Sequence, residues 1–521
     1  MAIYPSRVGA IALRDISITE RLFEGLAGHP DDVVMIDGST GAEMTAGDLM
    51  DRIRRLAGGL TERRWAPGRT LAILAPNIPE YAVVFHGVAF AGGTITTINP
   101  TYTVPEVHHQ LMDAGATVLI TTPMFADVAR AAMAGTGVTD LVVIGGGVAG
   151  AQALDDLMGD PLAAQSPVDL DDFNVVLPYS SGTTGKPKGV MLTHRNIVTN
   201  VEQLVVPAGL QPGETAIAFL PFFHIYGMTV LMNLVLGNEG RLVTMARFDL
   251  EQFLRLIETH RANRLYIVPP VALALAKHPM VDQFDTSSVS YVFSGAAPLG
   301  AEVEEAVGRR LGARSIQGYG MTEMSPVSHC TYPDSERHGS SGQAVPNTEC
   351  RIVDPVSGAD MDPGAEGELW VRGPQVMKGY LNNDAATAET MAPGGWLKTG
   401  DLAVIDDDGF MFIRDRLKEL IKVKGFQVAP AEVEAALIAH DGVADAAVIG
   451  RADDAAGEVP IAFVVKAAGA EVSQADLAAH CEGCLAHYKH PVEYRFVASV
   501  PKSASGKILR RELRDLVKAE G

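Results

Sequence analysis

Residues 179–189 carry the clearest chemical signature in this chain. They read Tyr-Ser-Ser-Gly-Thr-Thr-Gly-Lys-Pro-Lys-Gly, with three glycines, four serine or threonine hydroxyls and two lysines in eleven residues. Glycines let backbone N–H groups converge on one anion, hydroxyls add donors, and lysines add positive charge. The composition therefore predicts a loop that binds a polyphosphate. Its candidate contact residues are Ser180, Ser181, Gly182, Thr183, Thr184 and Lys188.

This loop does not have the spacing of a Walker A motif. That motif places four residues between its glycines and a hydroxyl directly after its lysine. Here only two residues separate Gly182 from Gly185, and Pro187 follows Lys186. A flexible surface hairpin has a similar composition. The loop alone leaves both interpretations open, and the rest of the sequence has to decide between them.

Two kinds of segment alternate around the loop and would have to position it. Short, continuous apolar runs are typical of strands buried on both faces, and they occupy residues 70–75, 116–120, 141–144 and 265–268. Helical patterns lie between such runs, for example at residues 46–63 and 299–311. Alternation of this kind predicts two doubly wound parallel α/β units over residues 1–328, meeting near the loop.

The pattern changes after these units. Residues 329–413 contain short strands and turn signals, which predict a small β-barrel or curled sheet. From residue 417 onward helical and strand patterns mix again. We therefore expect an N-terminal part over residues 1–416 and a smaller α+β domain over residues 417–521, with near-neutral charge and the character of a lid.

Composition narrows the class of protein. The 521 residues are 47% hydrophobic and 20% charged, and their net charge of −21 argues against a nucleic-acid partner. Four cysteines are too few for a disulfide scaffold. The N-terminus lacks the apolar core of a signal peptide, and we expect no membrane span. A cytoplasmic location is the expectation that fits these features.

Further segments match the adenylate-forming superfamily in the order that this family has them. They are residues 179–189, 317–323, 364–373, 396–401, 414–422 and 501–507. Within the superfamily the chain resembles acyl-CoA synthetases of the 4-coumarate–CoA ligase branch, above all in residues 424–432 and around Lys507. The resemblance implies an AMP-forming ligase that uses ATP, Mg²⁺, coenzyme A and a small carboxylic acid.

The resemblance also assigns site residues. Besides the loop residues, the nucleotide-binding set comprises Gln317, Gly318, Tyr319, Thr322, Asp401 and Arg416. Glu323 is the expected magnesium ligand, since magnesium prefers one or two carboxylates together with phosphate oxygens. The catalytic set comprises His224, Lys418, Lys422 and Lys507, with Lys418 at the hinge between the domains. The set expected to bind CoA comprises Arg247, Lys424, Gly425 and Gln427.

The acyl pocket implied by the resemblance is apolar. Its positions map to Tyr226, Val230, Phe293, Ala296, Gly318, Pro326 and Val327. No lysine or arginine among them could pair with a second carboxylate, so a flat aromatic acid such as cinnamate or 4-coumarate is expected. A medium-chain fatty acid and a carrier protein as acyl acceptor remain alternatives. Met324 and Arg247 depart from the residues usual in the family and leave the substrate open.

Two other patterns suggest different chemistry. Residues 141–150 combine a strand with three spaced glycines, as a dinucleotide-binding oxidoreductase would. The acidic residue expected at the end of the next strand is absent, so we interpret the segment as a turn. The other is a group of histidines and cysteines that resembles a zinc site but lacks two separated pairs. It comprises His480, Cys481, Cys484, His487 and His490.

Overall fold

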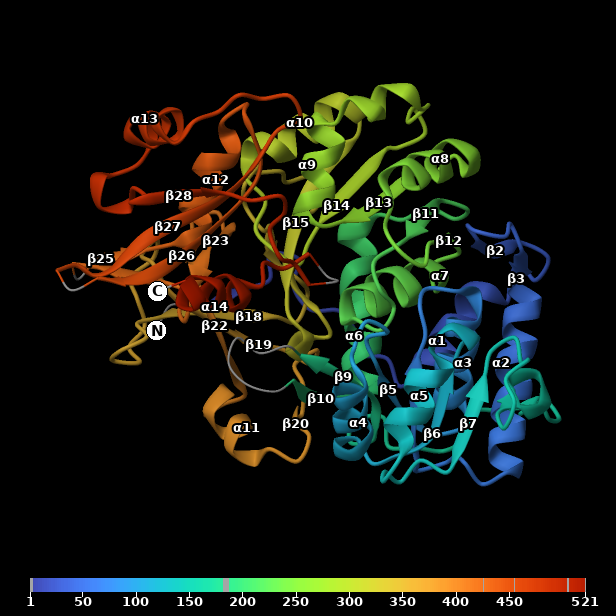
Figure 1. Cartoon of the computed structure of the whole chain (residues 1–521). Helices are drawn as coiled ribbons and strands as arrows, with labels where there is room; N and C mark the ends of the chain where they lie inside the picture. The colour runs from blue at the N-terminus through green and yellow to red at the C-terminus, as the bar shows by residue number, and fades with distance from the viewer. Residues whose placement is uncertain (1–2, 181–186, 425, 454, 504–505, 521) are drawn as a thin grey trace.

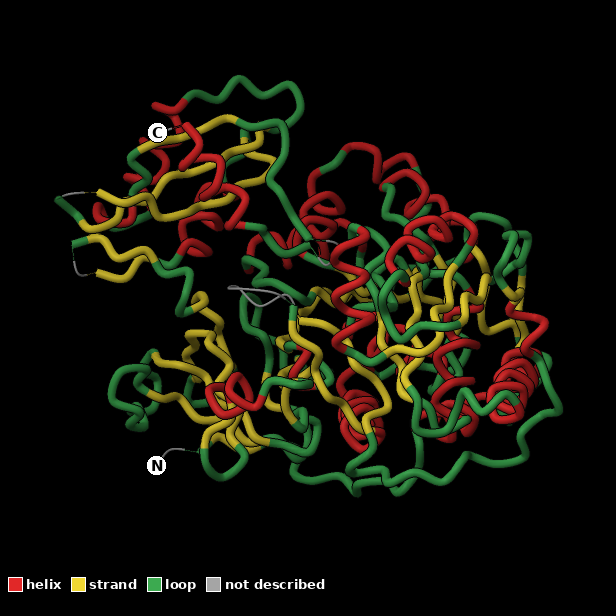
Figure 2. The backbone as a smooth tube through the Cα atoms, turned by 60° about the horizontal axis from the view of Figure 1, so that its bottom comes forward, coloured by secondary structure: helices red, strands yellow, loops and turns green. Residues whose placement is uncertain are grey.

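A computed structural model describes residues 3–180, 187–424, 426–453, 455–503 and 506–520. Figure 1 shows a large body coloured mainly blue to yellow, with an orange helix at its lower left, and a smaller orange-to-red lobe that ends at the C-terminus. Figure 2 shows the same lobe, turned, as a separate group of strands and helices joined to the body by loops. The fold is thus mixed α/β with two parts of unequal size, as the sequence predicts.

The first sheet has eight strands and carries the candidate phosphate loop. Its order is β20 (Gly379–Tyr380), β10 (Lys188–Thr193), β9 (Asn174–Ser180), β5 (Thr94–Thr97), β4 (Thr70–Leu74), β6 (Ala116–Thr121), β7 (Asp140–Val143) and β8 (Gln152–Ala153). From β9 to β8 the pairs are parallel, whereas β10 is antiparallel to both neighbours. The loop therefore joins the last parallel strand to an antiparallel edge.

The second sheet has nine strands. Its order is β17 (Gln343–Ala344), β16 (Val327–Cys330), β15 (Arg314–Gly320), β14 (Tyr291–Ser294), β13 (Arg264–Ile267), β11 (Thr215–Ala218), β12 (Arg241–Thr244), β2 (Val33–Asp37) and β3 (Glu43–Thr45). The strands from β15 to β2 are parallel, and antiparallel strands close both edges. These two sheets are the two predicted α/β units.

Helices cover both sheets. They are α1 (Ile18–Leu26), α2 (Ala46–Glu62), α3 (Pro79–Phe90), α4 (Val104–Asp113), α5 (Ala126–Met133), α6 (His194–Ala208), the π-helix η3 (Tyr226–Asn233), α7 (Leu234–Leu236), α8 (Leu250–His260), α9 (Pro269–Lys277) and α10 (Ala301–Leu311). Helix α3 contacts β5 of one sheet and β2 of the other. Because protein surrounds it, its apolar residues follow no one-sided pattern.

A third sheet of six strands follows. It consists of β1 (Tyr4–Pro5), β18 (Glu349–Val353), β19 (Gly367–Arg372), β22 (Trp396–Ile405), β21 (Met391–Ala392) and β23 (Met411–Arg416), with α11 (Asp384–Thr390) beside it. It corresponds to the small β unit predicted for residues 329–413. Two details differ from that prediction, because the N-terminal β1 joins this sheet while β17 and β20 leave it for the larger ones.

The C-terminal part is built on a fourth sheet. It contains β25 (Phe426–Val428), β24 (Ile421–Val423), β27 (Gly457–Lys466), β26 (Val443–Asp453) and β28 (Glu493–Phe496), and its helices are α12 (Pro430–Ala439), α13 (Gln474–Cys484) and α14 (Arg510–Glu520). Its buried apolar residues form clusters of their own on the two faces of the sheet. The buried residues of the main core run to Met411, and those of the C-terminal clusters begin at Ile421; the boundary expected at residues 416–417 stays a prediction.

The glycine-rich segment after β7 is a turn. Gly145, Gly146, Gly147 and Gly150 all have positive φ angles, between 66° and 83°. A short strand and the 3₁₀ helix η2 (Leu154–Leu157) follow, where a dinucleotide-binding unit would begin a long helix at the glycines. Among the described residues, no helix has the length and apolar character needed to cross a membrane.

Candidate active site

Most of the predicted site residues gather where the parallel strands of both large sheets end. Carboxyl ends of parallel strands are the usual ligand-binding edge of such sheets. Strand β9 ends at Ser180, which pairs with Lys188 at the start of β10. Ser181, Gly182, Thr183 and Thr184 lie outside the described residues. Ser180 and Lys188, which flank them in the predicted phosphate loop, lie at this edge.

Glu323 lies beside the base of that loop. It belongs to the 3₁₀ helix η5 (Thr322–Met324), and its side chain is buried. The Tyr380 hydroxyl on β20 donates a hydrogen bond of 2.8 Å to Glu323 Oε1, and the Lys188 ammonium lies 3.9 Å from the centre of the Tyr380 ring. Tyr380 thus connects the predicted metal ligand to the predicted phosphate-binding lysine. The sequence interpretation missed Tyr380, because only the fold brings β20 and η5 together.

A second acidic group joins the nine-stranded and six-stranded sheets. Asp401 on β22 is 4% exposed, and its Oδ2 accepts a 2.5 Å hydrogen bond from the Tyr319 hydroxyl of β15. Its Oδ1 lies 3.1 Å from Arg416 Nε on the neighbouring β23. Asp401 raises the pKa of Arg416, the main cause being their attraction. Three residues predicted to bind the nucleotide therefore form one group, joined by a hydrogen bond and an ion pair.

Lys507 reaches this group from the C-terminal part. The Ser503 amide donates to the Lys507 carbonyl at 2.8 Å, and the Lys507 amide donates to Ser503 Oγ at 3.1 Å. Gly506, at φ +79°, packs so closely on Val268 that an added Cβ would lie 3.1 Å from a methyl carbon. The Lys507 side chain is half-buried. Burial and Arg416 lower its pKa to about 8, against the opposing attraction of Asp401 and Glu323.

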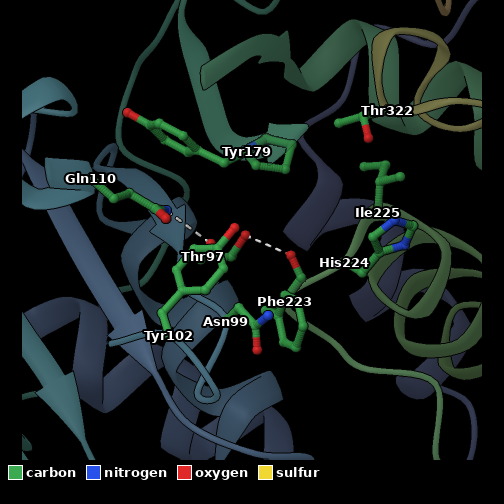
Figure 3. A pocket seen from close by; sticks show the side chains of 10 residues that line it. Thr97, Asn99, Tyr102, Gln110, Tyr179, Phe223, His224, Ile225 and Thr322 are labelled. Atoms are coloured by element: carbon green, nitrogen blue, oxygen red, sulfur yellow. Dashed lines mark hydrogen bonds between the residues drawn. The ribbon is translucent and has the colours of Figure 1, made fainter. Parts of the chain in front are cut away.

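His224 lines a small cavity between the two large sheets, about 20 Å³ in volume. Figure 3 shows His224 and Thr322 on one side of it, with Gln110 and Tyr102 opposite. The Tyr226 amide donates to His224 Nδ1 at 3.3 Å, so the neutral ring carries its proton on Nε2. Burial, and secondly the Lys507 charge, lower the pKa of His224 to about 3, which keeps the imidazole neutral.

Three of the predicted acyl-pocket residues are in contact. The Tyr226 and Phe293 rings meet edge to face, with centroids 6.1 Å apart, and Tyr226 belongs to the π-helix η3. A Cβ on Gly318 would lie 2.5 Å from Phe293 Cζ, so only glycine allows this approach. Val230 follows on η3, Ala296 has a φ of +72°, and Pro326 and Val327 lead into β16. That these residues line an acyl pocket stays a prediction.

Gln317 differs from the other nucleotide-motif residues. Its Nε2 donates to Glu304 Oε2 and to the Leu299 carbonyl, both at 2.8 Å, and its Oε1 accepts from the Leu299 amide. These bonds hold the segment after β14 in place. Gln317 therefore supports the site by positioning backbone, and its predicted contact with the nucleotide stays a prediction.

The residues predicted for the second half of the reaction lie apart from this group. Lys418 is exposed in the turn between β23 and β24, and Lys422, Lys424 and Gln427 are exposed on the β24–β25 hairpin. Gly425 lies outside the described residues. Figure 1 shows β25 at the outer edge of the red-orange lobe. Arg247 is exposed in the loop after β12.

Glu323 fits the magnesium role in its chemistry. One carboxylate oxygen accepts from Tyr380, and the neighbouring loop would supply phosphates. Magnesium keeps several waters and needs only one or two carboxylates beside phosphate oxygens.

In the described part of the chain, no three His, Cys, Asp or Glu side chains surround a common point. In the His/Cys segment, His480 and His490 each direct Nε2 to a backbone carbonyl at 2.9 Å.

Known proteins resemble the chain along nearly all of its length. Residues 22–381 match the AMP-binding enzyme family, and residues 432–507 match the AMP-binding enzyme C-terminal domain. 4-Coumarate–CoA ligase 5 of Oryza sativa subsp. japonica is 41% identical over 98% of this chain and 97% of that protein. A probable 4-coumarate–CoA ligase 1 of Dictyostelium discoideum is 36% identical over the same shares.

Solved structures resemble the chain over about as much of its length as the relatives' sequences do. An anthranilate CoA ligase, AuaEII, in complex with anthranoyl-AMP, has a TM-score of 0.89 and 26% identity, with 98% of this chain and 99% of that one covered. ATP-bound MatB from Rhodopseudomonas palustris has a TM-score of 0.86 and 29% identity, with 96% and 99% covered. The likeness thus includes both parts of the chain.

Proposed function

Because the chain belongs to the AMP-binding enzyme family, we propose that it is an AMP-forming carboxylic acid–CoA ligase. It joins a cinnamate-type acid to the thiol of coenzyme A at the expense of ATP, which becomes AMP and pyrophosphate. The observation that carries the proposal is the Lys507 ammonium, held beside Asp401, Arg416 and Glu323 by a loop that packs on Val268. The ligase names of its relatives support the same reaction.

In the first step a carboxylate oxygen of the acid attacks the α-phosphorus of ATP. The bond from that phosphorus to the bridging oxygen breaks, and pyrophosphate leaves with its electron pair. Charge grows on the α-phosphate, so positioned cations stabilise the transition state. Lys507 would bridge carboxylate and α-phosphate, while Lys188 and the loop would hold the outer phosphates. Asp401 would accept the ribose hydroxyls, and Tyr319 would lie against the base.

In the second step the thiol of CoA attacks the acyl carbonyl and AMP leaves. With Lys507 bridging the acyl group and the phosphate, the thiol would have no approach to the carbonyl, so Lys507 would have to withdraw. We propose that the C-terminal domain, residues 417–521, turns on Lys418 and brings the hairpin with Lys424 and Gln427 to the thiol. His224 would border the path of the thiol, with Lys422 and Arg247 near the cofactor.

Glu323 would hold Mg²⁺ together with phosphate oxygens, and the ion would supply compensation for phosphate charge. The enzyme would work in the cytoplasm, where the four free cysteines remain reduced. The expected substrate is a flat phenylpropanoid acid and not a dicarboxylic one. The rings of Tyr226 and Phe293 and the lack of a side chain at Gly318 favour it.

The test is an assay of the whole protein with ATP, Mg²⁺ and a panel of acids, with and without CoA. We expect acid-dependent pyrophosphate and AMP with cinnamates, and a thioester when CoA is present. Release of ADP would contradict the proposal. Preference for medium-chain fatty acids, or transfer only to a carrier protein, would identify a different ligase of the same family.

A further inference from the structure

Helix α12 of the C-terminal part lacks stabilising side chains of its own at both ends. The residue at its N-cap is Ala429, whose methyl group accepts no hydrogen bond, and Pro430 follows at the first helical position. The last turn, residues 436–439, contains no basic residue. A helix leaves amide hydrogens free at its N-terminus and carbonyl oxygens free at its C-terminus, where an anion and a cation respectively are favourable. Both ends of α12 therefore depend on side chains from elsewhere.

The large body supplies an acceptor at the N-terminus of α12. Asp415 lies on β23, and its backbone pairs with Leu402 of β22 in the six-stranded sheet. Its side chain is buried against the C-terminal part, where Oδ2 accepts a 2.8 Å hydrogen bond from the amide of Ala431, the second residue of α12. Burial raises the pKa of Asp415, and the positive charge of Arg510 on α14 is the main opposing influence. Asp415 thus takes the place of the N-cap side chain that Ala429 lacks.

The body also supplies a cation at the C-terminus of α12. Lys277 is the last residue of α9, and its ammonium donates a 3.1 Å hydrogen bond to the carbonyl of Ile438 in the last turn of α12. The carbonyl of Ala436 accepts a hydrogen bond from within the domain, from His480 Nε2. Lys277 is exposed, so its contact should be weaker than that of the buried Asp415. Each end of α12 is thus held by a body residue whose charge complements the helix dipole.

Neighbouring residues of β23 face opposite parts of the molecule. Arg416 pairs with Asp401 of the body, whereas Asp415 bonds to α12. Asp415 and Lys277 both lie on the body side of Lys418, where the C-terminal domain is proposed to turn. A rotation at Lys418 would carry α12 away and leave these two residues behind, so it would break both contacts. The two contacts therefore stabilise the arrangement that the structure shows relative to the rotated one.

We propose that Asp415 and Lys277 are positioning residues, which hold the C-terminal domain docked by the two ends of α12 while the acid is adenylated. Docking keeps Lys507 in the site, and release of α12 frees the domain for thioester formation. This inference rests on the proposed function, and it adds the contacts that set the balance between the two arrangements. Weakening either contact should favour the second step relative to the first.

The experiment measures the two half-reactions separately on the whole protein. Adenylation is followed as pyrophosphate release from ATP and the best acid of the panel without CoA, and thioester formation starts from the matching acyl-AMP and CoA. When the domain exchanges quickly between its arrangements, the first rate is proportional to the docked fraction and the second to the released fraction. Their ratio therefore follows the docking equilibrium, whichever arrangement predominates. A general loss of stability lowers both rates and leaves the ratio unchanged.

We expect Asp415→Ala to raise the ratio of thioester formation to adenylation by about 2- to 30-fold, the effect of a lost N-cap acceptor. Asp415→Asn should raise it less, because its amide oxygen can still accept from Ala431. Lys277→Ala should raise it by about 1.7- to 5-fold, and Lys277→Arg should keep the wild-type ratio, since a cation stays at the helix end. Arg255→Ala is the matched control, because this exposed cation of α8 pairs with Glu251 of its own helix.

The inference is overturned if both alanine variants keep the wild-type ratio, or if Asp415→Asn raises it as much as Asp415→Ala. A rise with Asp415→Ala alone overturns it as well, because Asp415 Oδ1 also accepts from the Arg416 amide and could act on the nucleotide site through that residue. A wild-type protein that releases no pyrophosphate with any acid contradicts the proposed ligase itself, so the two failures are told apart.

Discussion

Two lysine-bearing loops of the C-terminal part lie in opposite surroundings. Lys507 is half-buried among Arg416, Asp401 and Glu323, and burial and Arg416 lower its pKa to about 8. Lys424 is exposed on the β24–β25 hairpin, with a φ of +49°. The same small domain thus presents one lysine to the large body and keeps the other away from it. This is the arrangement expected for a domain that uses its two ends in turn.

Lys507→Ala should give the largest effect. The variant loses a positioned cation at the α-phosphate, and pyrophosphate release from acid and ATP should fall by about 10²–10³ or more. Conversion of supplied acyl-AMP and CoA to thioester should persist, because that step has no such charge to bridge. The two half-reactions are measured separately. An equal loss in both would contradict the division of labour between the two loops.

Lys418→Pro should produce the opposite pattern. Proline fixes φ near −65° and costs roughly 3 kcal/mol where the backbone needs another φ. If only the rotated state of the C-terminal domain needs another φ, that cost slows thioester formation by about 10². Adenylation should survive and thioester formation should fall by that factor. Lys418→Ala is the matched control, since it removes the same ammonium and leaves φ free. Normal thioester formation by the proline variant would show that the turn is not the hinge.

The rates of adenylation and of thioester formation should depend differently on pH, and this difference should be smaller than the effects of the two substitutions. Lys507 acts as the protonated ammonium, so adenylation should be full below its pKa and decline above it. Bound phosphates raise that pKa, so the decline should start at or above pH 8 and approach about tenfold per pH unit. The thioester step from supplied acyl-AMP should lack this decline. Lys507→Arg should lack it too, because arginine stays protonated.

Lys424→Ala should have the smallest effect. An exposed ammonium contributes about 0.2–1 kcal/mol to an ionic contact, so KM for CoA should rise by about 1.4- to 5-fold, and less at high salt. Adenylation should not change. A loss as large as that of Lys507→Ala would mean that Lys424 is desolvated when CoA binds, and that exposure in the present arrangement understates its role.

Local pattern was enough to predict the elements that carry the site. The apolar runs at residues 70–75 and 265–268 are strands β4 and β13, and the helical pattern at 46–63 is α2. The glycine-rich segment at 141–150 is the turn that the missing acidic residue indicated. Sheet membership was harder to predict, because β1 and β20 pair with strands far from them in sequence.

The sequence by itself determined the residue types that can bind phosphate, the order of the motifs and the apolar character of the residues predicted for the acyl pocket. These properties depend only on which residues occur and on how far apart they lie along the chain. Only the tertiary structure decided that Tyr380 contacts Glu323 and that the Gln317 amide donates hydrogen bonds to Leu299 and Glu304. Such contacts depend on strand register and domain placement, because hydrogen bonds and burial act across space and are not encoded by spacing along the chain.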